Sequence, residues 1–407
     1  MSLFSALLSN RVTPEYSGFS LVSVVGDRYW LVQPSVYSTC NRVKIESRTE
    51  LTYKREFDFR SGGTCVIVSE TDQRLLQLMQ WLEKRLGTSN IRIEPASSDA
   101  SFRRYFRVFV EQKTLIAMDA PPPQENVSGF VAVSDIFRDA GVHVPEIIAS
   151  DYQSGFLLLS DFGHQCYFDQ LSEANADQLY ADAFDALLQI QTGVATSTNA
   201  LPVYDASLLQ QELDFFSQWF VEQLLGLVLT TRQHQIFQTS CQRLVNSALE
   251  QPRVCVHRDF HSRNLMVLDT NNPGVIDFQD AVIGPLTYDL VSLLRDCYIS
   301  WPVAKVDDWR NQFYQRSLLA GVFTSAISQN QYQQWFDKMG VQRHLKAIGI
   351  FSRLNIRDGK LGYLKDIPTT INYVVTICEH DAELAELSQL LNQVIVPAMQ
   401  THPEFQS

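Results

Sequence analysis

One short stretch of the sequence carries residues whose types and order suit phosphoryl transfer. His257, Arg258 and Asp259 stand together, Asn264 follows Asp259 by five residues, and Asp277 follows Asn264 by thirteen. This is the order found in kinase-type sites, where one carboxylate orients the acceptor hydroxyl and oxygen ligands hold Mg²⁺ on the phosphates. We therefore expect Asp259 to be the catalytic base and Asn264 and Asp277 to be the metal ligands.

The elements around these residues must hold them in place. Apolar runs at residues 254–256, 265–268 and 275–276 predict short buried strands. An isolated Asp or Asn in a turn would more often cap the local backbone. Three such side chains in this order, each beside a predicted strand, favour catalysis instead. His257 and Arg258 are expected to support Asp259 from behind.

Further motifs give the chain a resemblance to a known family. They lie at residues 99–107 (Asp-Ala-Ser-Phe-Arg-Arg-Tyr-Phe-Arg), 284–290, 293–298 and 357–360. With the catalytic stretch, they resemble the aminoglycoside phosphotransferase family over about residues 75–395. Within that family they look most like the bacterial branch of N-acetylmuramate/N-acetylglucosamine anomeric sugar kinases.

This resemblance implies an α+β, two-lobed fold of the protein-kinase type. A small β-rich N-lobe would span residues 73–160, and a larger, mostly helical C-lobe with the catalytic loop would span 161–407. Residues 1–72 match nothing in the family and are expected to be a β-rich or disordered appendage of unknown role. Strands are predicted there at residues 21–25, 29–32, 43–45, 50–53 and 64–69.

The implied activity is ATP-dependent phosphorylation of the anomeric hydroxyl of an N-acetyl amino sugar, in the recycling of cell-wall sugars. ATP and Mg²⁺ are the implied cofactors. Two alternatives remain open: a kinase for another small hydroxyl acceptor, such as an aminoglycoside or amino alcohol, and a pseudokinase module that only binds nucleotide.

The nucleotide-binding residues are expected on both sides of the lobe junction. A turn of small residues precedes the predicted strand 102–110, so its backbone N–H groups could approach phosphate oxygens. The backbone around residues 159–162 would meet the adenine edge, which makes Asp161, in a misleading Asp-Phe-Gly sequence, a turn residue and not a metal ligand. The candidate nucleotide contacts are Ser98, Asp99, Ala100, Ser101, Arg104, Leu159 and Asp161.

The sequence departs from the kinase pattern where a phosphate-pairing lysine is expected. The predicted strand 114–119 carries Met118 near that position, and Lys113 comes too early. Arg103, Arg104 and Arg107 on the preceding strand are the candidates for replacing its charge. Glu125, expected in the first turn of a helix over 124–140, loses its usual lysine partner.

The acceptor-binding residues are expected to come from the segments after the catalytic loop. The candidates are His261, Asp280, Arg295 and Trp301. Arg295, Arg353 or Arg357 could pair with a lactyl carboxylate, because a guanidinium matches a carboxylate geometrically. Trp301 could stack on a sugar ring, although a Trp in the core is at least as common. Asp289 is expected to cap a helix or brace the catalytic loop.

Composition limits the remaining function classes. The net charge of −12 argues against a nucleic-acid partner, and no apolar stretch is long enough for a spanning helix. Seven cysteines without paired spacing predict reduced thiols in a cytoplasmic protein. No obligate protein partner is inferred. Apolar residues at helical spacing predict helices over 75–86, 175–191, 207–225, 233–249, 287–299, 309–328, 331–355 and 382–399.

Overall fold

The computed structural model describes residues 20–25, 28–32, 72–97, 102–197 and 200–406. These residues belong to two compact units, of which the smaller takes in residues up to Ser97 together with Tyr105–Asp119. The larger contains Ser98–Arg104 and Ala120–Ser407. Near the N-terminus, strands β1 (Ser20–Val25) and β2 (Arg28–Val32) form an antiparallel pair. They match the predicted strands 21–25 and 29–32, while the other strands predicted before residue 72 lie outside the described residues.

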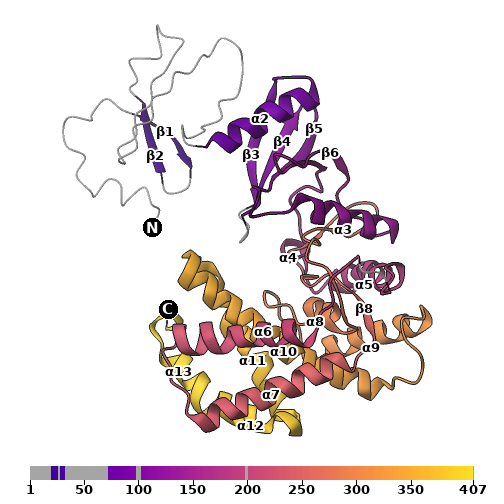
Figure 1. Cartoon of the computed structure of the whole chain (residues 1–407), viewed down its shortest axis with the longest axis vertical. Coiled ribbons are helices and arrows are strands. Elements are labelled where there is room, and N and C mark those ends of the chain that lie inside the picture. Colours follow the sequence, from indigo (N-terminus) through magenta and orange to yellow (C-terminus); the bar gives the residue numbers. More distant parts are fainter. Residues whose placement is uncertain (1–19, 26–27, 33–71, 98–101, 198–199, 407) are drawn as a thin grey trace, which may run out of the picture. The chain divides into compact units, whose positions relative to one another are not determined.

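The smaller unit contains helix α2 (Gln73–Leu86) and strands β3 (Ile91–Ser97), β4 (Arg104–Val110) and β5 (Lys113–Asp119) (Figure 1). Strands β3 and β4 are antiparallel. Helix α2 buries Leu75, Leu78 and Leu82 and ends at Gly87, whose φ of 69° is a conformation that glycine adopts without strain. Arg74 Nε donates a 2.9 Å hydrogen bond to the buried carboxylate of Asp119, which ties this helix to β5.

The larger unit begins with helix α3 (Val127–Asp139) and an antiparallel strand pair, β6 (Ile147–Asp151) and β7 (Phe156–Ser160). Helices α4 (Tyr167–Gln170), α5 (Ala176–Gly193), α6 (Ala206–Phe215) and α7 (Thr231–Leu249) follow, with a π-helix, η4 (Phe216–Leu224), extending α6. Four short strands then carry the catalytic stretch: β8 (Arg253–Val256), β9 (Leu265–Met266), β10 (Gly274–Val275) and β11 (Val282–Pro285). Strand β11 pairs with β8 and β10 pairs with β9, both antiparallel.

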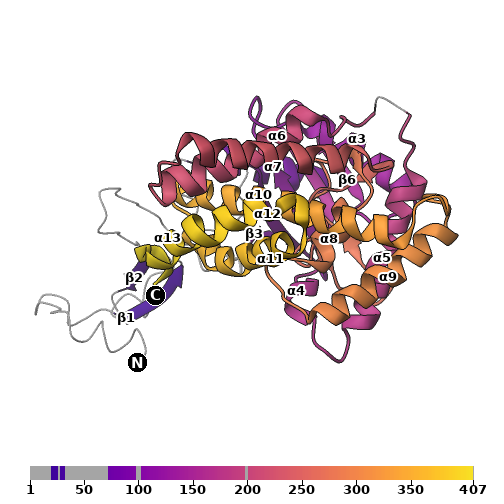
Figure 2. The ribbon, with the colours of Figure 1, turned by 90° about the horizontal axis from the view of Figure 1, so that it is seen from below.

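The rest of the chain is helical. It comprises α8 (Tyr288–Leu294), α9 (Val303–Leu319), α10 (Gln329–Asp358), η5 (Leu361–Asp366), α11 (Ile367–His380), η6 (Ala382–Leu384), α12 (Ala385–Leu390), η7 (Leu391–Ile395), α13 (Val396–Thr401) and η8 (Pro403–Phe405). The long helix α10 is the centre of this bundle and contacts α6, η4, α7, α8 and α11 (Figure 2). Gly349 permits one of these contacts, because a Cβ there would lie 2.4 Å from the carbonyl carbon of Phe215.

The architecture confirms the predicted fold class: a small antiparallel sheet part and a larger helical part of the kinase type. The predicted helices all occur, but several of their bounds differ. The helix expected over 207–225 changes to π geometry at Phe216, and the helix expected to reach 299 ends at Leu294. The helix expected over 309–328 spans Val303–Leu319, and the helix expected over 382–399 is divided into η6, α12, η7 and α13. Helix α11 was not predicted, although its apolar residues have helical spacing.

None of the described helices combines the length and apolar character that crossing a bilayer would require. This agrees with the absence of a long apolar stretch from the sequence.

Candidate active site

The catalytic stretch folds into two loops, one between β8 and β9 and one between β10 and β11. Each loop contains a residue with a backbone conformation that is rare for side chains other than glycine: φ is 78° at Arg258 and 63° at Asp277. Such backbone strain persists only where surrounding contacts enforce it, and it is concentrated at functional sites. One of the two positions directly precedes Asp259, and the other is a predicted metal ligand.

His257 holds Asp259 through its imidazole ring. Its Nδ1 lies 3.2 Å from the backbone nitrogen of Asp259, and its Nε2 lies 3.1 Å from the carbonyl oxygen of Ile276. Burial lowers the pKa of His257 to about 4, so the ring is neutral at pH 7. A neutral ring meets both contacts when Nε2–H donates to Ile276 and Nδ1 accepts from Asp259. The ring thereby links the two loops.

Two buried carboxylates brace the same loop from helix α8 and the residues after it. Asp289 accepts hydrogen bonds from the backbone N–H groups of His257, at 2.6 Å, and Arg258, at 3.0 Å. Burial raises the pKa of Asp289 to about 7, against the effect of these two bonds. Asp296 accepts from both the backbone N–H and the hydroxyl of Ser262. Asp289 is therefore the loop brace that the sequence suggested as one of two roles.

Arg258 and Lys346 share one buried carboxylate, that of Glu212 on α6. The guanidinium of Arg258 lies 2.6 Å from Glu212, and the ammonium of Lys346 lies 3.1 Å from it. Lys346 also donates to the hydroxyl of Tyr288 at 2.9 Å. Despite its burial, the pKa of Glu212 is lowered by these two cations. Glu212 and Lys346 were not identified from the sequence.

The electrostatic surroundings keep Asp259 ionised. Burial opposes the charge, but Lys346, His261, Arg343 and Arg258 outweigh it and lower the pKa of Asp259 to about 2. A carboxylate that stays charged near neutral pH can orient an acceptor hydroxyl and accept its proton in the transition state. This arrangement fits the role predicted for Asp259.

Asn264 and Asp277 lie next to each other beside Asp259. The amide nitrogen of Asn264 is 3.0 Å from the carbonyl oxygen of Asp259 and 3.4 Å from the carboxylate of Asp277. With its amide nitrogen engaged in this way, Asn264 has its amide oxygen left for a ligand. One carboxylate and one amide oxygen suit Mg²⁺ that is also held by substrate phosphates and water. In keeping with this, the described residues contain no cluster of three or more His, Cys, Asp or Glu side chains that would hold a metal alone.

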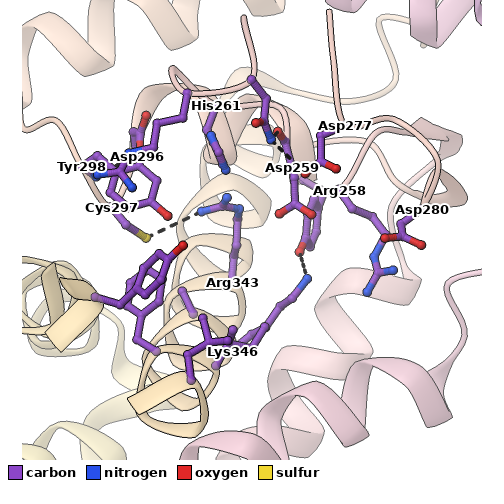
Figure 3. Close-up of a pocket in the computed structure, with 18 residues that line it drawn as sticks. Arg258, Asp259, His261, Asp277, Asp280, Asp296, Cys297, Tyr298, Arg343 and Lys346 are labelled. Carbon is purple, nitrogen blue, oxygen red and sulfur yellow. Dashed lines mark hydrogen bonds between the residues drawn. The ribbon is translucent and has the colours of Figure 1, made fainter. Parts of the chain in front are cut away.

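A cavity of about 330 Å³ opens in front of these groups (Figure 3). It lies wholly within the larger unit. One side is aromatic, with Tyr298, Phe351 and Tyr363, and the rings of Phe351 and Tyr363 stack at 5.5 Å. The charged lining residues are Arg258, Asp259, Arg263, Asp277, Asp280, Asp296, Arg343 and Lys346. Of these, Asp296 lies beside Tyr298 (Figure 3), and the guanidinium of Arg263 lies 3.6 Å from the centre of the Tyr298 ring. A cavity that combines aromatic and charged groups suits a polar ring-shaped ligand.

The cavity brings together five of the seven residues predicted for catalysis, metal binding and acceptor binding. Asp259, His261, Asn264, Asp277 and Asp280 line it. By contrast, its lining includes neither Arg295 nor Trp301.

These two side chains have other partners. The guanidinium of Arg295 pairs with Asp337 and lies over the ring of Phe336. The indole N–H of Trp301 donates to the hydroxyl of Tyr180 at 2.8 Å.

Two other arginines proposed for the acceptor lie near the end of α10. Arg353 packs over the ring of Phe215, and Arg357 pairs with the neighbouring Asp358. Neither lines the cavity, where Arg343, from the same helix, is found instead. Arg343 belongs to a helical face whose members recur at spacings of three and four, and all of them line the cavity: Arg343, Lys346, Ala347, Ile350, Phe351 and Leu354. Two basic residues on a helix face that is otherwise mostly apolar were the sequence feature that could have identified Arg343 and Lys346.

Part of the predicted nucleotide site can be placed. Ser98, Asp99, Ala100 and Ser101 lie outside the described residues. Leu159 is buried in β7, and the carboxylate of Asp161 accepts a 2.8 Å hydrogen bond from Gly163 N–H, as expected of a turn residue. Arg104 begins β4.

The residues considered in connection with the missing strand lysine are Met118, Glu125 and the arginines of the preceding strand. Met118, near the position of that lysine, is fully buried. Glu125 lies two residues before the start of α3, and not in its first turn as expected. Its carboxylate is 3.9 Å from Arg103 Nε, so Glu125 pairs with one of the three arginines proposed to replace the lysine.

A strained His-Arg-Asp loop, an adjacent Asn and Asp, and a helical part of the kinase type define a phosphotransferase site. The comparisons agree, since the sequence profile described as "Phosphotransferase enzyme family" matches residues 92–324. The chain belongs to this family.

Relatives with similar sequences carry a more specific name. A protein of Pseudomonas putida named N-acetylmuramate/N-acetylglucosamine kinase is 46% identical over 335 residues, covering 80% of this chain and 98% of the relative. Proteins of the same name from Pseudomonas aeruginosa and Neisseria meningitidis are 46% and 38% identical, each over 79% of this chain and 96% of the relative. The chain is therefore a kinase, as the site predicted.

Solved structures support the fold. A choline/ethanolamine kinase family protein from Mesorhizobium loti superposes with a TM-score of 0.54 at 11% identity, covering 78% of this chain and all of that one. A choline kinase from Streptococcus pneumoniae gives 0.52 at 9% identity, covering 74% and 99%. At such low identities the likeness concerns the fold alone.

Proposed function

We propose that this kinase uses ATP and Mg²⁺ to phosphorylate the anomeric hydroxyl of an N-acetylated amino sugar. The observation that carries the proposal is Asp259, kept ionised at the wall of a cavity that has an aromatic side. The names of the relatives supply the acceptor class, N-acetylmuramate and N-acetylglucosamine. An anomeric hydroxyl is more acidic than an alkyl one, so its proton is the easier one for Asp259 to accept.

The chain's own residues divide the work. Asp259 orients the hydroxyl and accepts its proton, while neutral His257 fixes the backbone of Asp259. Asn264 and Asp277 would hold Mg²⁺, which when bound neutralises charge on the phosphates. Leu159, Asp161, Arg104 and the turn at residues 98–101 are proposed to bind the nucleotide. The division into an appendage, an N-lobe and a C-lobe at residues 72 and 160 also remains our proposal.

Two other acceptor classes fit the cavity less well. Aminoglycosides and amino alcohols are cations. In this cavity a cationic acceptor would meet the carboxylates of Asp259, Asp277, Asp280 and Asp296, but also four basic side chains: Arg258, Arg263, Arg343 and Lys346. Of these, Arg343 forms no ion pair with any carboxylate of the described residues, so it would repel a cation directly. A sugar with neutral or acidic substituents avoids this cost.

The test is an ATP-consumption assay with a panel of N-acetylglucosamine, N-acetylmuramate, kanamycin and choline. The proposal predicts turnover with the two amino sugars only, and only when Mg²⁺ is present. Turnover with kanamycin or choline alone would reassign the acceptor class. Nucleotide binding without turnover of any acceptor would indicate a pseudokinase.

A further inference from the structure

Arg343 is a buried cation that forms no ion pair with a carboxylate of the described residues, although Asp259 and Asp296 are near enough to act on its charge. Arg343 is 6% exposed, and within the described part of the chain the one hydrogen bond of its side chain runs from a guanidinium nitrogen to the sulfur of Cys297, 3.9 Å away. Its Nε has no partner among the described residues. A thiol is a weak acceptor, and burial raises the pKa of Cys297, so this sulfur carries a proton near neutral pH and supplies no negative charge.

Two other cations that line this cavity do have an anionic partner within the protein. Arg258 and Lys346 both pair with Glu212. Lys346 stands three residues after Arg343 on α10 and so shares its helix face. A buried charge without a hydrogen-bonded anion is costly, and a ligand that supplies such an anion reduces the cost. Arg258 and Lys346 have Glu212 as their anion, whereas at Arg343 a bound ligand is left to provide one.

His261 places a second unsatisfied polar atom in the same part of the cavity. Its Nδ1 is buried and has no hydrogen-bond partner among the residues described. Figure 3 shows the His261 ring facing the Arg343 guanidinium, with Asp259 beside them. The guanidinium of Arg343 and Nδ1 of His261 are therefore both available to hydrogen-bond a ligand beside Asp259, the proposed base.

We propose that Arg343 is the residue that recognises a carboxylate on the acceptor sugar and thereby sets the preference for acidic over neutral amino sugars. This deepens the proposed function and rests on it. N-acetylmuramate differs from N-acetylglucosamine by a lactyl ether that carries a carboxylate. A guanidinium binds a carboxylate through two parallel hydrogen bonds, which a neutral hydroxyl cannot match. The role is one of binding and not of proton transfer.

The experiment compares kcat/KM for the two sugars in wild-type enzyme and in Arg343→Gln. The ratio of the value for N-acetylmuramate to that for N-acetylglucosamine should fall by about tenfold or more, because a bond between charged partners is replaced by a neutral one. The change should appear in KM. Arg343→Lys keeps the charge without the planar fork and should restore part of the ratio.

Arg310→Gln is the matched control. Arg310 is also a buried arginine, 4% exposed, but it pairs with Asp307 on α9 and does not line the cavity. Its loss should leave the ratio unchanged. The methyl ester of N-acetylmuramate gives a second measurement that needs no variant: the wild-type enzyme should use it less well than the free acid, and Arg343→Gln should treat the two alike.

Each outcome decides between the two claims. If the wild-type enzyme phosphorylates neither sugar, the proposed function fails and this inference with it. If it phosphorylates both but Arg343→Gln leaves the ratio unchanged, or ester and acid are used equally, only the carboxylate assignment fails. An equal fall in kcat for both sugars at constant KM would also refute the carboxylate assignment, because it would show that Arg343 acts on Asp259 or on the transferred phosphoryl group.

Discussion

The backbone N–H of Asp259 donates to Nδ1 of His257 across 3.2 Å, and the other nitrogen of that ring contacts Ile276 in the neighbouring loop. One neutral imidazole thus contacts both Asp259, the proposed base, and the residue before Asp277, the proposed metal ligand. The position of Asp259 depends on this ring, while its charge depends on the cations around it. The following predictions separate these contributions.

Asp259→Asn should reduce turnover by about 10²- to 10⁴-fold, the usual contribution of a positioned general base. The substitution keeps the shape of the side chain and removes its charge. Nucleotide affinity, measured by calorimetry, should stay close to that of the wild type. Retention of full activity would remove Asp259 from the mechanism.

Asp277→Ala and Asp161→Ala should have different effects, although both residues begin an Asp-Phe pair. The carboxylate of Asp277 lies 3.4 Å from the amide nitrogen of Asn264 and lines the cavity. The carboxylate of Asp161 instead accepts a hydrogen bond from the backbone N–H of Gly163 and stabilises a turn. Loss of Asp277 should abolish Mg²⁺-dependent turnover. Loss of Asp161 should lower only thermal stability or the affinity for ATP. The opposite ranking in steady-state assays would refute the assignment of the metal ligands.

Lys346→Met should make the reaction sensitive to acid. Burial alone would raise the pKa of Asp259, and Lys346 is the foremost of the charges that lower it to about 2. In the wild type, Asp259 therefore stays ionised well below pH 5. Without Lys346 its pKa rises, so the ionised fraction and kcat should fall at a higher pH than in the wild type. Superimposable pH profiles for the two enzymes would show that Lys346 does not tune Asp259.

Gly349→Ala should destabilise the helical bundle. The added Cβ would lie 2.4 Å from the carbonyl carbon of Phe215, and backbone cannot move aside as a flexible side chain can. Gly129→Ala is the control, because Gly129 is also helical but has nothing within 4 Å of the new Cβ. That change should stabilise the protein by up to about 1 kcal/mol. Thermal melting should move in opposite directions for the two variants.

Arg103→Ala should weaken ATP binding more than Arg107→Ala does. Arg103 is the arginine whose Nε lies 3.9 Å from Glu125, in a chain that has Met118 near the position of the strand lysine. We expect the KM for ATP to rise while the KM for the sugar stays constant. Equal effects of the two substitutions would leave Arg103 without a special role.

The sequence predicted the part of the site that is local along the chain. Asp259, Asn264 and Asp277 lie within nineteen residues, so their spacing alone places them in adjacent loops. Asp280 and His261 were found for the same reason. These residues line one cavity in the structure.

The other side of the cavity comes from residues far along the chain. Arg343 and Lys346 follow the catalytic loop by about eighty residues on α10. Helical periodicity shows which residues share a face, but not which cavity that face lines. Trp301 illustrates the reverse problem. It stands near the catalytic motifs in sequence, yet its indole binds Tyr180, because an aromatic side chain follows the packing of the core around it.

The central claim is that Asp259 receives the proton of an anomeric hydroxyl. The most direct measurement compares N-acetylglucosamine with its methyl glycoside, in which the anomeric oxygen is blocked and every other hydroxyl is retained. Phosphorus NMR of the products measures the phosphorylation of each compound. Our account predicts that the free sugar is phosphorylated and the glycoside is not. Equal phosphorylation of the two compounds would contradict it.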